Sequence, residues 1–207
     1  FSNLPLILSC NYRGVLKKWM IAVYICNMGK LIIIIICLLS GSISCSGQIS
    51  EHMKSLIKDL EGLSTEVYMD GEEPAVGYGH HLCHTKYQWV RDLEPGDEIT
   101  AEMADLLFDY DMLYLVTPGI EKVKADLGPD YPVNVYDVMG SVIYNIGLTG
   151  LIRSDFYRLF KKGDYEGAFT ELLMLKSRDR GVYERRKKEL RVLLENYDFA
   201  QNKYRLR

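Results

Sequence analysis

The segment "VNVYDVMGSVIYNIG", residues 133–147, limits most strongly what this chain can fold into. It predicts a helix that is apolar on almost every side, and the apolar residues at helical spacing are Val135, Met139, Val142, Ile143 and Ile146. Such a helix is stable in water only when other elements surround it. The rest of the chain must therefore form a shell around it, and Gly147 is expected to end it.

Further segments show the spacing of amphipathic helices, which suit such a shell. The first four begin at common helix-capping residues, which are Ser50, Thr100, Ser154 and Asp164. The helix from Thr100 is predicted to bury Leu106 and to end before Pro118. A last helix, from about Val182, is predicted to turn "RRKK" (185–188) to solvent. Its expected inward residues are Leu190, Leu193, Leu194 and Tyr197.

Residues 64–79 have the opposite character. Short alternating stretches flank the turn signal Asp70-Gly71, and glycines at 77 and 79 follow. This pattern predicts a small β-hairpin or a three-stranded sheet. One helix, a small sheet and then several helices indicate an α+β domain with two lobes, one bearing the sheet and the other mainly helical.

The front of the chain differs from the rest. Residues 28–47 begin "MGK", continue with a nine-residue apolar run and end in small residues, which predicts a signal peptide. Two alternatives stay open: lipid attachment at Cys45, and an uncleaved membrane anchor over residues 19–39. Residues 1–27 are interpreted as an upstream extension with no assigned function, and residues 48–207 as the catalytic domain. An exported protein of the periplasm or cell envelope is therefore expected.

Charge and cysteine content argue against a nucleic-acid-binding protein and a disulfide-stabilised domain. Residues 51–150 carry a net charge of −13 and residues 151–207 one of +6, so an anionic polymer would be drawn to the second part if these charges mark two lobes. The usual alternative is simply a solvated surface. Nucleic acid is not expected as a partner, since the total charge is −3 and no binding motif occurs. Cys83 alone falls within 48–207, which excludes a disulfide framework.

Two carboxylates nine residues apart, Glu61 and Asp70, are candidates for acid catalysis. Glycoside hydrolysis needs one carboxyl group to protonate the leaving oxygen and a second to activate water or to stabilise the sugar cation. Glu61 is assigned as the acid, because a helix end and many nearby acids favour its protonated form. Asp70 is assigned as the group that positions water. Spacing alone is a weak signal in a segment this rich in acids.

The surrounding motifs resemble those of the phage-type lysozymes, glycoside hydrolase family 24. "EGLSTEVYMDGEEPAVGYGH" (61–80) is similar to the family's active-site segment, with Glu61, Tyr68-x-Asp70 and "VGYGH" (76–80) in the matching places. Four later segments also match in order. They are "ITAEMADLLFDYD" (99–111), "SVIYNIG" (141–147), "GDYEGAF" (163–169) and "GVYERRKKE" (181–189).

The resemblance implies a two-lobed lysozyme-like fold that clasps glycan strands of peptidoglycan. The implied reaction is cleavage of the β-1,4 link between N-acetylmuramic acid and N-acetylglucosamine by a muramidase, with inversion and without a cofactor. Ala75 is assigned by the resemblance to a substrate-binding position, but it departs from the pattern, because the family has a water-holding threonine there and a loop one residue longer. Loss of that hydroxyl leaves an alternative open: a weak or inactive module that binds peptidoglycan. A membrane-anchored structural domain is a third hypothesis, and the biological role can be phage lysis or local opening of the wall.

The resemblance also assigns further positions. His80 is expected to make a structural contact between the lobes, and Asn145 to face the groove or to form a core hydrogen bond. Arg185 and Arg186 are expected either to contact substrate or to lie on a solvated helix face. "GHHLCH" (79–84) gathers potential metal ligands, but residues this close in sequence seldom converge, so no metal is expected. A monomer is expected.

Overall fold

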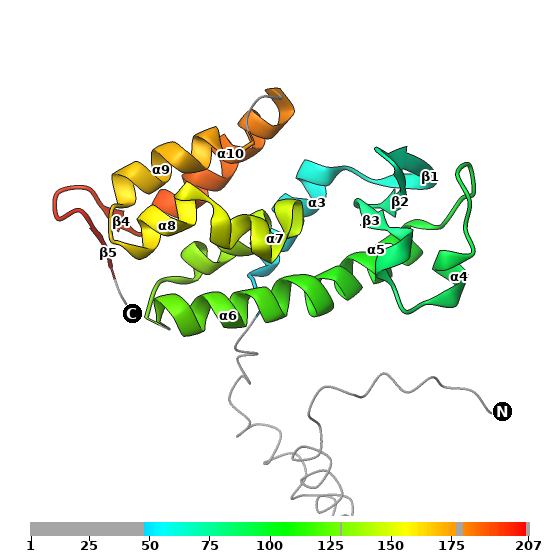
Figure 1. Ribbon diagram of the computed structural model, residues 1–207, viewed down its shortest axis with the longest axis horizontal. Helices are drawn as coiled ribbons and strands as arrows, with labels where there is room; N and C mark the ends of the chain where they lie inside the picture. Colours follow the sequence, from blue (N-terminus) through cyan, green and yellow to red (C-terminus); the bar gives the residue numbers. More distant parts are fainter. Residues whose placement is uncertain (1–47, 129, 177–179, 206–207) are drawn as a thin grey trace, which may run out of the picture. The chain divides into compact units, whose positions relative to one another are not determined.

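Helix α7 (Val133–Arg153) runs through the middle of the protein (Figure 1), as the apolar segment 133–147 predicts. Every residue from 134 to 143 on this helix is buried. The computed structural model describes residues 48–128, 130–176 and 180–205, which belong to one unit spanning Ser46–Arg207. The expected extension (1–27) and the expected signal segment (28–47) therefore lie outside the described residues, as do the alternatives at 19–39 and Cys45.

Helices surround α7 and share one apolar core with it. They are α3 (Glu51–Glu61), α5 (Ala101–Asp111), α6 (Thr117–Leu127), α8 (Asp155–Lys161), α9 (Tyr165–Met174) and α10 (Arg180–Leu194). A short helix, α4 (Gln88–Arg91), lies beside the sheet, and a small hairpin of β4 (Tyr197–Asp198) and β5 (Lys203–Tyr204) follows α10. In the described part of the chain, α7 alone is long and apolar enough to cross a membrane, and 56% of that stretch is buried in the protein.

The predicted sheet has three antiparallel strands in sequence order, β1 (Ser64–Asp70), β2 (Glu73–Gly77) and β3 (His80–His81). Val67 and Val76 point to one face, where they form a second, smaller core with residues of α4 and α5. Alternation along the strands sends Tyr68, Asp70 and Ala75 to the other face. One face of the sheet thus packs on helices and the other carries the candidate residue Asp70, and the α+β prediction is confirmed.

Several helix boundaries agree with the capping residues read from the sequence. Ser50, Thr100, Ser154 and Asp164 each accept a hydrogen bond from a backbone N–H in the first turn of the following helix. Each of these bonds satisfies one of the otherwise unpaired donors at a helix start. The positions of α3, α5, α8 and α9 along the chain therefore follow from local chemistry.

The helix from Thr100 ends at Asp111, before Pro118 as predicted, but the chain stays helical beyond that end. A π-helical stretch, Met112–Val116, joins α5 to α6, and Pro118 lies in the first turn of α6, where its missing N–H costs no hydrogen bond. Thr117 Oγ1 donates to the Met112 carbonyl at 2.8 Å, which helps satisfy the carbonyls of the π-helical stretch. Leu106 is 44% exposed and not inward, because Ala104, Leu107 and Phe108 form the buried stripe of α5.

Gly147 (φ +75°) ends the first helical segment of α7, as predicted, and a second segment continues to Arg153 before Ser154 caps α8. One further expectation needs correction. Tyr197 is buried as expected, yet it lies in β4 after the end of α10. The "RRKK" segment is also not uniformly solvated, as the site below shows.

Candidate active site

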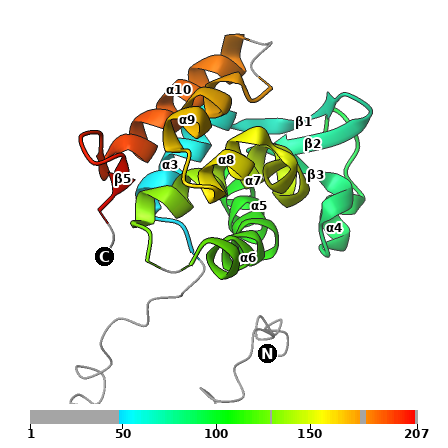
Figure 2. The same cartoon turned by 60° about the vertical axis from the view of Figure 1, so that its left-hand side comes forward.

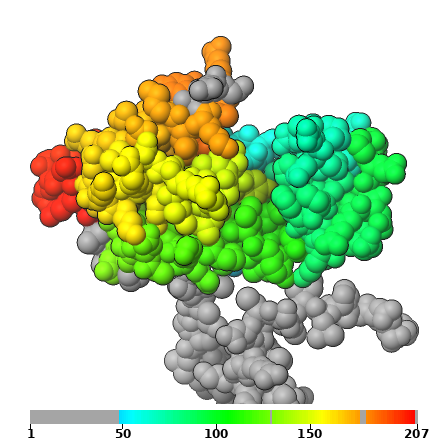
Figure 3. Space-filling view, viewed as in Figure 1, coloured from blue at the N-terminus to red at the C-terminus, as the bar shows by residue number. Residues whose placement is uncertain are grey.

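Glu61 is the last residue of α3, where Gly62 (φ +73°) turns the chain into the sheet. Its side chain is 21% exposed, so the carboxylate is neither buried in the core nor free in solvent. Figures 1 and 2 both place this end of α3 between α10 and the β1–β2 hairpin. Figure 3 shows the surface hollowed at this point, between the teal sheet and the orange part of α10. Glu61 thus lies where the two lobes meet.

Arg185 on α10 holds one oxygen of Glu61. Its Nη1 donates to Oε1, while Oε2 lies 3.8 Å from the position that a side-chain carbon at Gly79 would occupy. Arg185 itself is only 6% exposed through its side chain. Burial lowers the pKa of this guanidinium, but the charges of Glu61 and Glu189 outweigh burial and raise it. The sequence did not predict a cation beside Glu61.

Behind this pair lies a buried carboxylate that the sequence argument missed. Glu189 Oε1 accepts from Arg185 Nε at 3.1 Å and from Ser141 Oγ at 2.6 Å, and Oε2 accepts from Arg186 Nη1 at 2.5 Å. Glu189 and Arg186 are both 0% exposed. The network therefore runs inward in the order Glu61, Arg185, Glu189 and Arg186, and the two negative and two positive formal charges cancel.

The prediction that Arg185 and Arg186 lie on a solvated face of α10 is wrong. Glu189 follows them at the i+4 and i+3 positions on the same helix face and neutralises their charges. Arg186 has no surface to offer a substrate in this structure. Its Nη2 instead donates to Asn145 Oδ1 at 2.6 Å. Asn145 is exposed, so its amide nitrogen is the group that can face a ligand.

Asp70 ends β1 and is 64% exposed through its side chain. Its Oδ2 lies 3.6 Å from Nε2 of His81. Tyr68, two residues earlier on the same face, links Asp70 to Glu61 electrostatically: burial raises the pKa of its hydroxyl, and Asp70 and then Glu61 raise it further. Both candidate carboxylates therefore act on one tyrosine at the inner face of the sheet.

Ala75 is on this face too, between its strand neighbours Tyr68 and His81. It is 0% exposed, so in this structure it presents no surface to a substrate, in contrast to the contact expected from the family threonine. A hydroxyl added at this position would reach water only if its surroundings moved.

His80 ties the sheet to the helical lobe. Its Nδ1 lies 2.9 Å from both carboxylate oxygens of Asp111 at the end of α5, and its side chain is 1% exposed. Tyr144 makes a second link, which sequence reasoning did not identify: its hydroxyl donates to the Tyr78 carbonyl at 2.8 Å. Burial raises the pKa of Tyr144, and the charges of Asp111 and Glu61 add to the effect. The hydroxyl therefore stays protonated as a donor.

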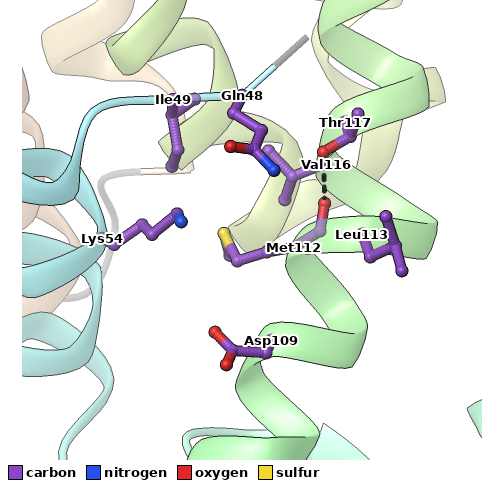
Figure 4. A pocket seen from close by; sticks show the side chains of 8 residues that line it. All are labelled: Gln48, Ile49, Lys54, Asp109, Met112, Leu113, Val116 and Thr117. Carbon is purple, nitrogen blue, oxygen red and sulfur yellow. Dashed lines mark hydrogen bonds between the residues drawn. The ribbon is translucent and has the colours of Figure 1, made fainter. Parts of the chain in front are cut away.

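A separate cavity lies away from this site. A cavity of about 290 Å³ lies at the other end of α3, beside the π-helical stretch (Figure 4). Its lining residues are Gln48, Ile49, Lys54, Asp109, Met112, Leu113, Val116 and Thr117. None of the residues predicted for catalysis lines it. The cavity lies at the start of α3 and Glu61 at its end, so the length of the helix separates them, roughly 15 Å at 1.5 Å per residue.

Known proteins resemble this chain over the region that holds the site. The family model described as phage lysozyme matches residues 58–189. An endolysin of Acyrthosiphon pisum secondary endosymbiont phage 1 is 31% identical over 126 residues, which cover 60% of this chain and 77% of that protein. An endolysin of Bacillus phage B103 is 30% identical over 128 residues, and the match spans 44% of its length.

Solved structures agree in fold. The muramidase domain of SpmX from Asticaccaulis excentricus superposes with a TM-score of 0.58 at 25% identity, covering 71% of this chain and 97% of that one. The endolysin from Escherichia coli O157:H7 phage FAHEc1 gives a TM-score of 0.57 at 27% identity, covering 72% and 94%. The described lobes therefore correspond to nearly whole lysozyme-type domains.

Proposed function

Because this chain belongs to the phage lysozyme family, we propose that it cuts the glycan strands of peptidoglycan, at the β-1,4 link between N-acetylmuramic acid and N-acetylglucosamine. The match runs from residue 58 to residue 189 and so contains both candidate carboxylates and the buried arginine–glutamate network. Glycoside hydrolysis by two carboxyl groups is the chemistry that these side chains can perform.

The observation that carries the proposal is the place of Glu61. A general acid must be within reach of the leaving oxygen and must be held still. Arg185 fixes Oε1 from the inside, and Oε2 faces Gly79, where the missing side chain leaves room for a sugar to approach. In the proposed mechanism Oε2 carries the proton and delivers it to the glycosidic oxygen.

Asp70 takes the second role. Its exposed carboxylate on the sheet can hold a water molecule and accept a proton from it as that water attacks the anomeric carbon. This arrangement corresponds to inversion, for which the two carboxyl groups are about 6.5–9.5 Å apart. The exposed amide of Asn145 is proposed to bind the sugar from the helical side, while Arg185 and Arg186 act by positioning Glu61 and Asn145.

Ala75 supports a second candidate function, a lysozyme-like module that binds peptidoglycan and cuts it slowly or not at all. The buried methyl group supplies no hydroxyl to hold water. A neutral hydrogen bond contributes about 0.5–1.5 kcal/mol, so its absence alone accounts for roughly a tenfold loss of rate. Neither the acid nor Asp70 is removed by this change, and for that reason the enzyme is the preferred proposal.

One experiment separates the two candidates. The purified full chain is incubated with purified peptidoglycan, and two quantities are measured: new reducing ends in solution, and the fraction of protein that sediments with the polymer. An enzyme releases reducing ends in proportion to time and protein. Sedimentation without any release would contradict the proposed hydrolase and leave the binding module.

Export to the periplasm or cell envelope is proposed from residues 28–47 and from the location of the substrate. Mass spectrometry of the protein recovered from its own cell tests this directly. A mature N-terminus near residues 44–48 agrees with cleavage of a signal peptide. A chain that still carries residue 28 would contradict cleavage and favour the anchored form.

A further inference from the structure

A carboxylate, a thiol and an imidazole meet at the rim of the small sheet. Glu73, Cys83 and His84 each bring one potential ligand atom within 4.8 Å of the other two. Cys83 Sγ lies 3.9 Å from Glu73 Oε2. All three side chains are exposed, so an ion in solution can reach them without any opening of the fold.

The backbone brings these residues together. Strands β2 and β3 pair with Ala75 opposite His81 and Val76 opposite His80. Cys83 and His84 lie in the turn Leu82–His84, which directly follows β3, and Glu73 is the first residue of β2. The pairing of β2 with β3 therefore brings this turn near Glu73. "GHHLCH" alone did not reveal it, because the carboxylate comes from the neighbouring strand.

We propose that Glu73, Cys83 and His84 form a binding site for a divalent transition-metal ion of the Zn²⁺ type. Zn²⁺ bonds of about 2.0–2.3 Å in a tetrahedron separate ligand atoms by roughly 3.3–3.8 Å. The sulfur-to-oxygen distance of 3.9 Å is close to this range, and small side-chain rotations bring the three atoms into it. Water completes the fourth position, as in other three-ligand zinc sites.

The choice of ion follows from the donor set. A thiolate and an imidazole bind soft and borderline ions, whereas Mg²⁺ and Ca²⁺ prefer sites made of oxygen atoms. One further residue, His81, lies beside the cluster: its Nδ1 is 3.1 Å from Glu73 Oε2 and its Nε2 is 3.6 Å from Asp70 Oδ2.

The alternative to a metal site is an ordinary hydrogen bond from the Cys83 thiol to Glu73, and the experiment must distinguish the two. A thiol–carboxylate bond has no need of His84. A metal site requires all three side chains, so affinity must depend on each of them. The test requires no glycosidase activity and is therefore independent of the function proposed above.

Titration of the full chain with Co²⁺, followed by the near-ultraviolet absorption of thiolate bound to cobalt, measures the site. Cys10, Cys26, Cys37 and Cys45 stay in every variant, so the signal of interest is the difference between the parent and Cys83→Ser. The parent is expected to bind one more Co²⁺ per chain than that variant. Zn²⁺ is expected to displace this ion, and millimolar Mg²⁺ is not.

Matched substitutions identify the other ligands. Glu73→Gln and His84→Gln are each expected to weaken this Co²⁺ binding by at least about tenfold, since even groups behind metal ligands contribute 10–100-fold. Glu72→Gln and His52→Gln, at exposed neighbouring or distant positions, are expected to bind like the parent. Equal titrations of parent and Cys83→Ser would overturn the proposal. So would unchanged affinity in Glu73→Gln or His84→Gln, or competition by Mg²⁺.

Discussion

Replacing Glu189 by glutamine tests the buried charge network that holds Glu61. The carboxylate is fully buried and accepts hydrogen bonds from both arginines and from Ser141. Glutamine has nearly the same shape, but it carries no charge, and its NH₂ group is a donor. In Glu189→Gln a donor therefore faces a guanidinium that also donates, and the anion between two buried cations is lost.

The size of the effect follows from what each arginine keeps. Arg185 keeps Glu61, whereas Arg186 keeps only neutral oxygens, the Asn145 side chain at 2.6 Å and the Leu175 carbonyl at 3.2 Å. Removing one partner of a buried ion pair lowers the unfolding free energy by about 3–5 kcal/mol, because the other charge is left uncompensated. In a domain of this size, 1 kcal/mol shifts the thermal midpoint by about 2–4 °C, so a decrease of about 6–20 °C is expected.

Urea unfolding of the full chain at pH 7, followed by far-ultraviolet circular dichroism, measures this loss of unfolding free energy. The matched control is Glu184→Gln on the same helix, where the carboxylate is exposed and pairs with Lys187 at 3.0 Å. Its unfolding midpoint is expected to equal that of the parent, because exposed ion pairs contribute little. A Glu189→Gln protein whose unfolding free energy lies within about 1 kcal/mol of the parent would refute the reasoning.

Three further predictions concern Asp70, Ala75 and Asp137. Asp70→Asn is expected to slow the release of reducing ends by about 10²–10⁴-fold with no change in thermal midpoint, since the side chain is largely exposed; a smaller loss in the rate assay would argue against a role in catalysis. Ala75→Thr and Ala75→Val each add two heavy atoms to a buried site, so both are expected to lower the unfolding free energy by about 1–3 kcal/mol. If a missing hydroxyl limits the rate, the threonine variant is expected to be up to about tenfold more active than the valine variant. Equal rates for the two variants would show that the position no longer reaches water. Burial raises the pKa of Asp137 above its ordinary value of 3.8, although Ser50 donates to it, so the ionised form is disfavoured in the folded state. The stability of the parent relative to Asp137→Asn is therefore expected to fall as pH rises above about 3.8 and to level off above the folded-state pKa. Urea midpoints of both proteins between about pH 3 and 7 measure this difference. A rise over that range would contradict the assignment.

Local chemistry made much of the fold predictable. Helix starts at Ser50, Thr100, Ser154 and Asp164 follow from capping side chains, and the central position of α7 follows from its apolar surface. The join between α5 and α6 did not follow, because a π-helical stretch before Pro118 has no comparable local signal. A proline appears in sequence as a stop, whereas here it begins the next helix.

The candidate site was only partly predictable for a related reason. Arg185 and Arg186 appear solvated when the helix is considered alone, yet Arg185 meets Glu61, a residue 124 positions earlier in the chain. Glu189 could have been identified from its i+4 and i+3 spacing to the two arginines. The cluster of Glu73, Cys83 and His84 depends on the pairing of β2 with β3, which brings Glu73 near Cys83 and cannot be read from either segment by itself.

The rate of Glu61→Gln on purified peptidoglycan tests the central claim most directly. Glutamine keeps the shape of the side chain and can still meet Arg185 through its carbonyl oxygen, but it has no acidic proton to give. Release of reducing ends is predicted to fall by about 10²–10⁴-fold relative to the parent, while sedimentation with peptidoglycan persists. A variant that cuts within tenfold of the parent rate would contradict the assignment of Glu61 as the acid.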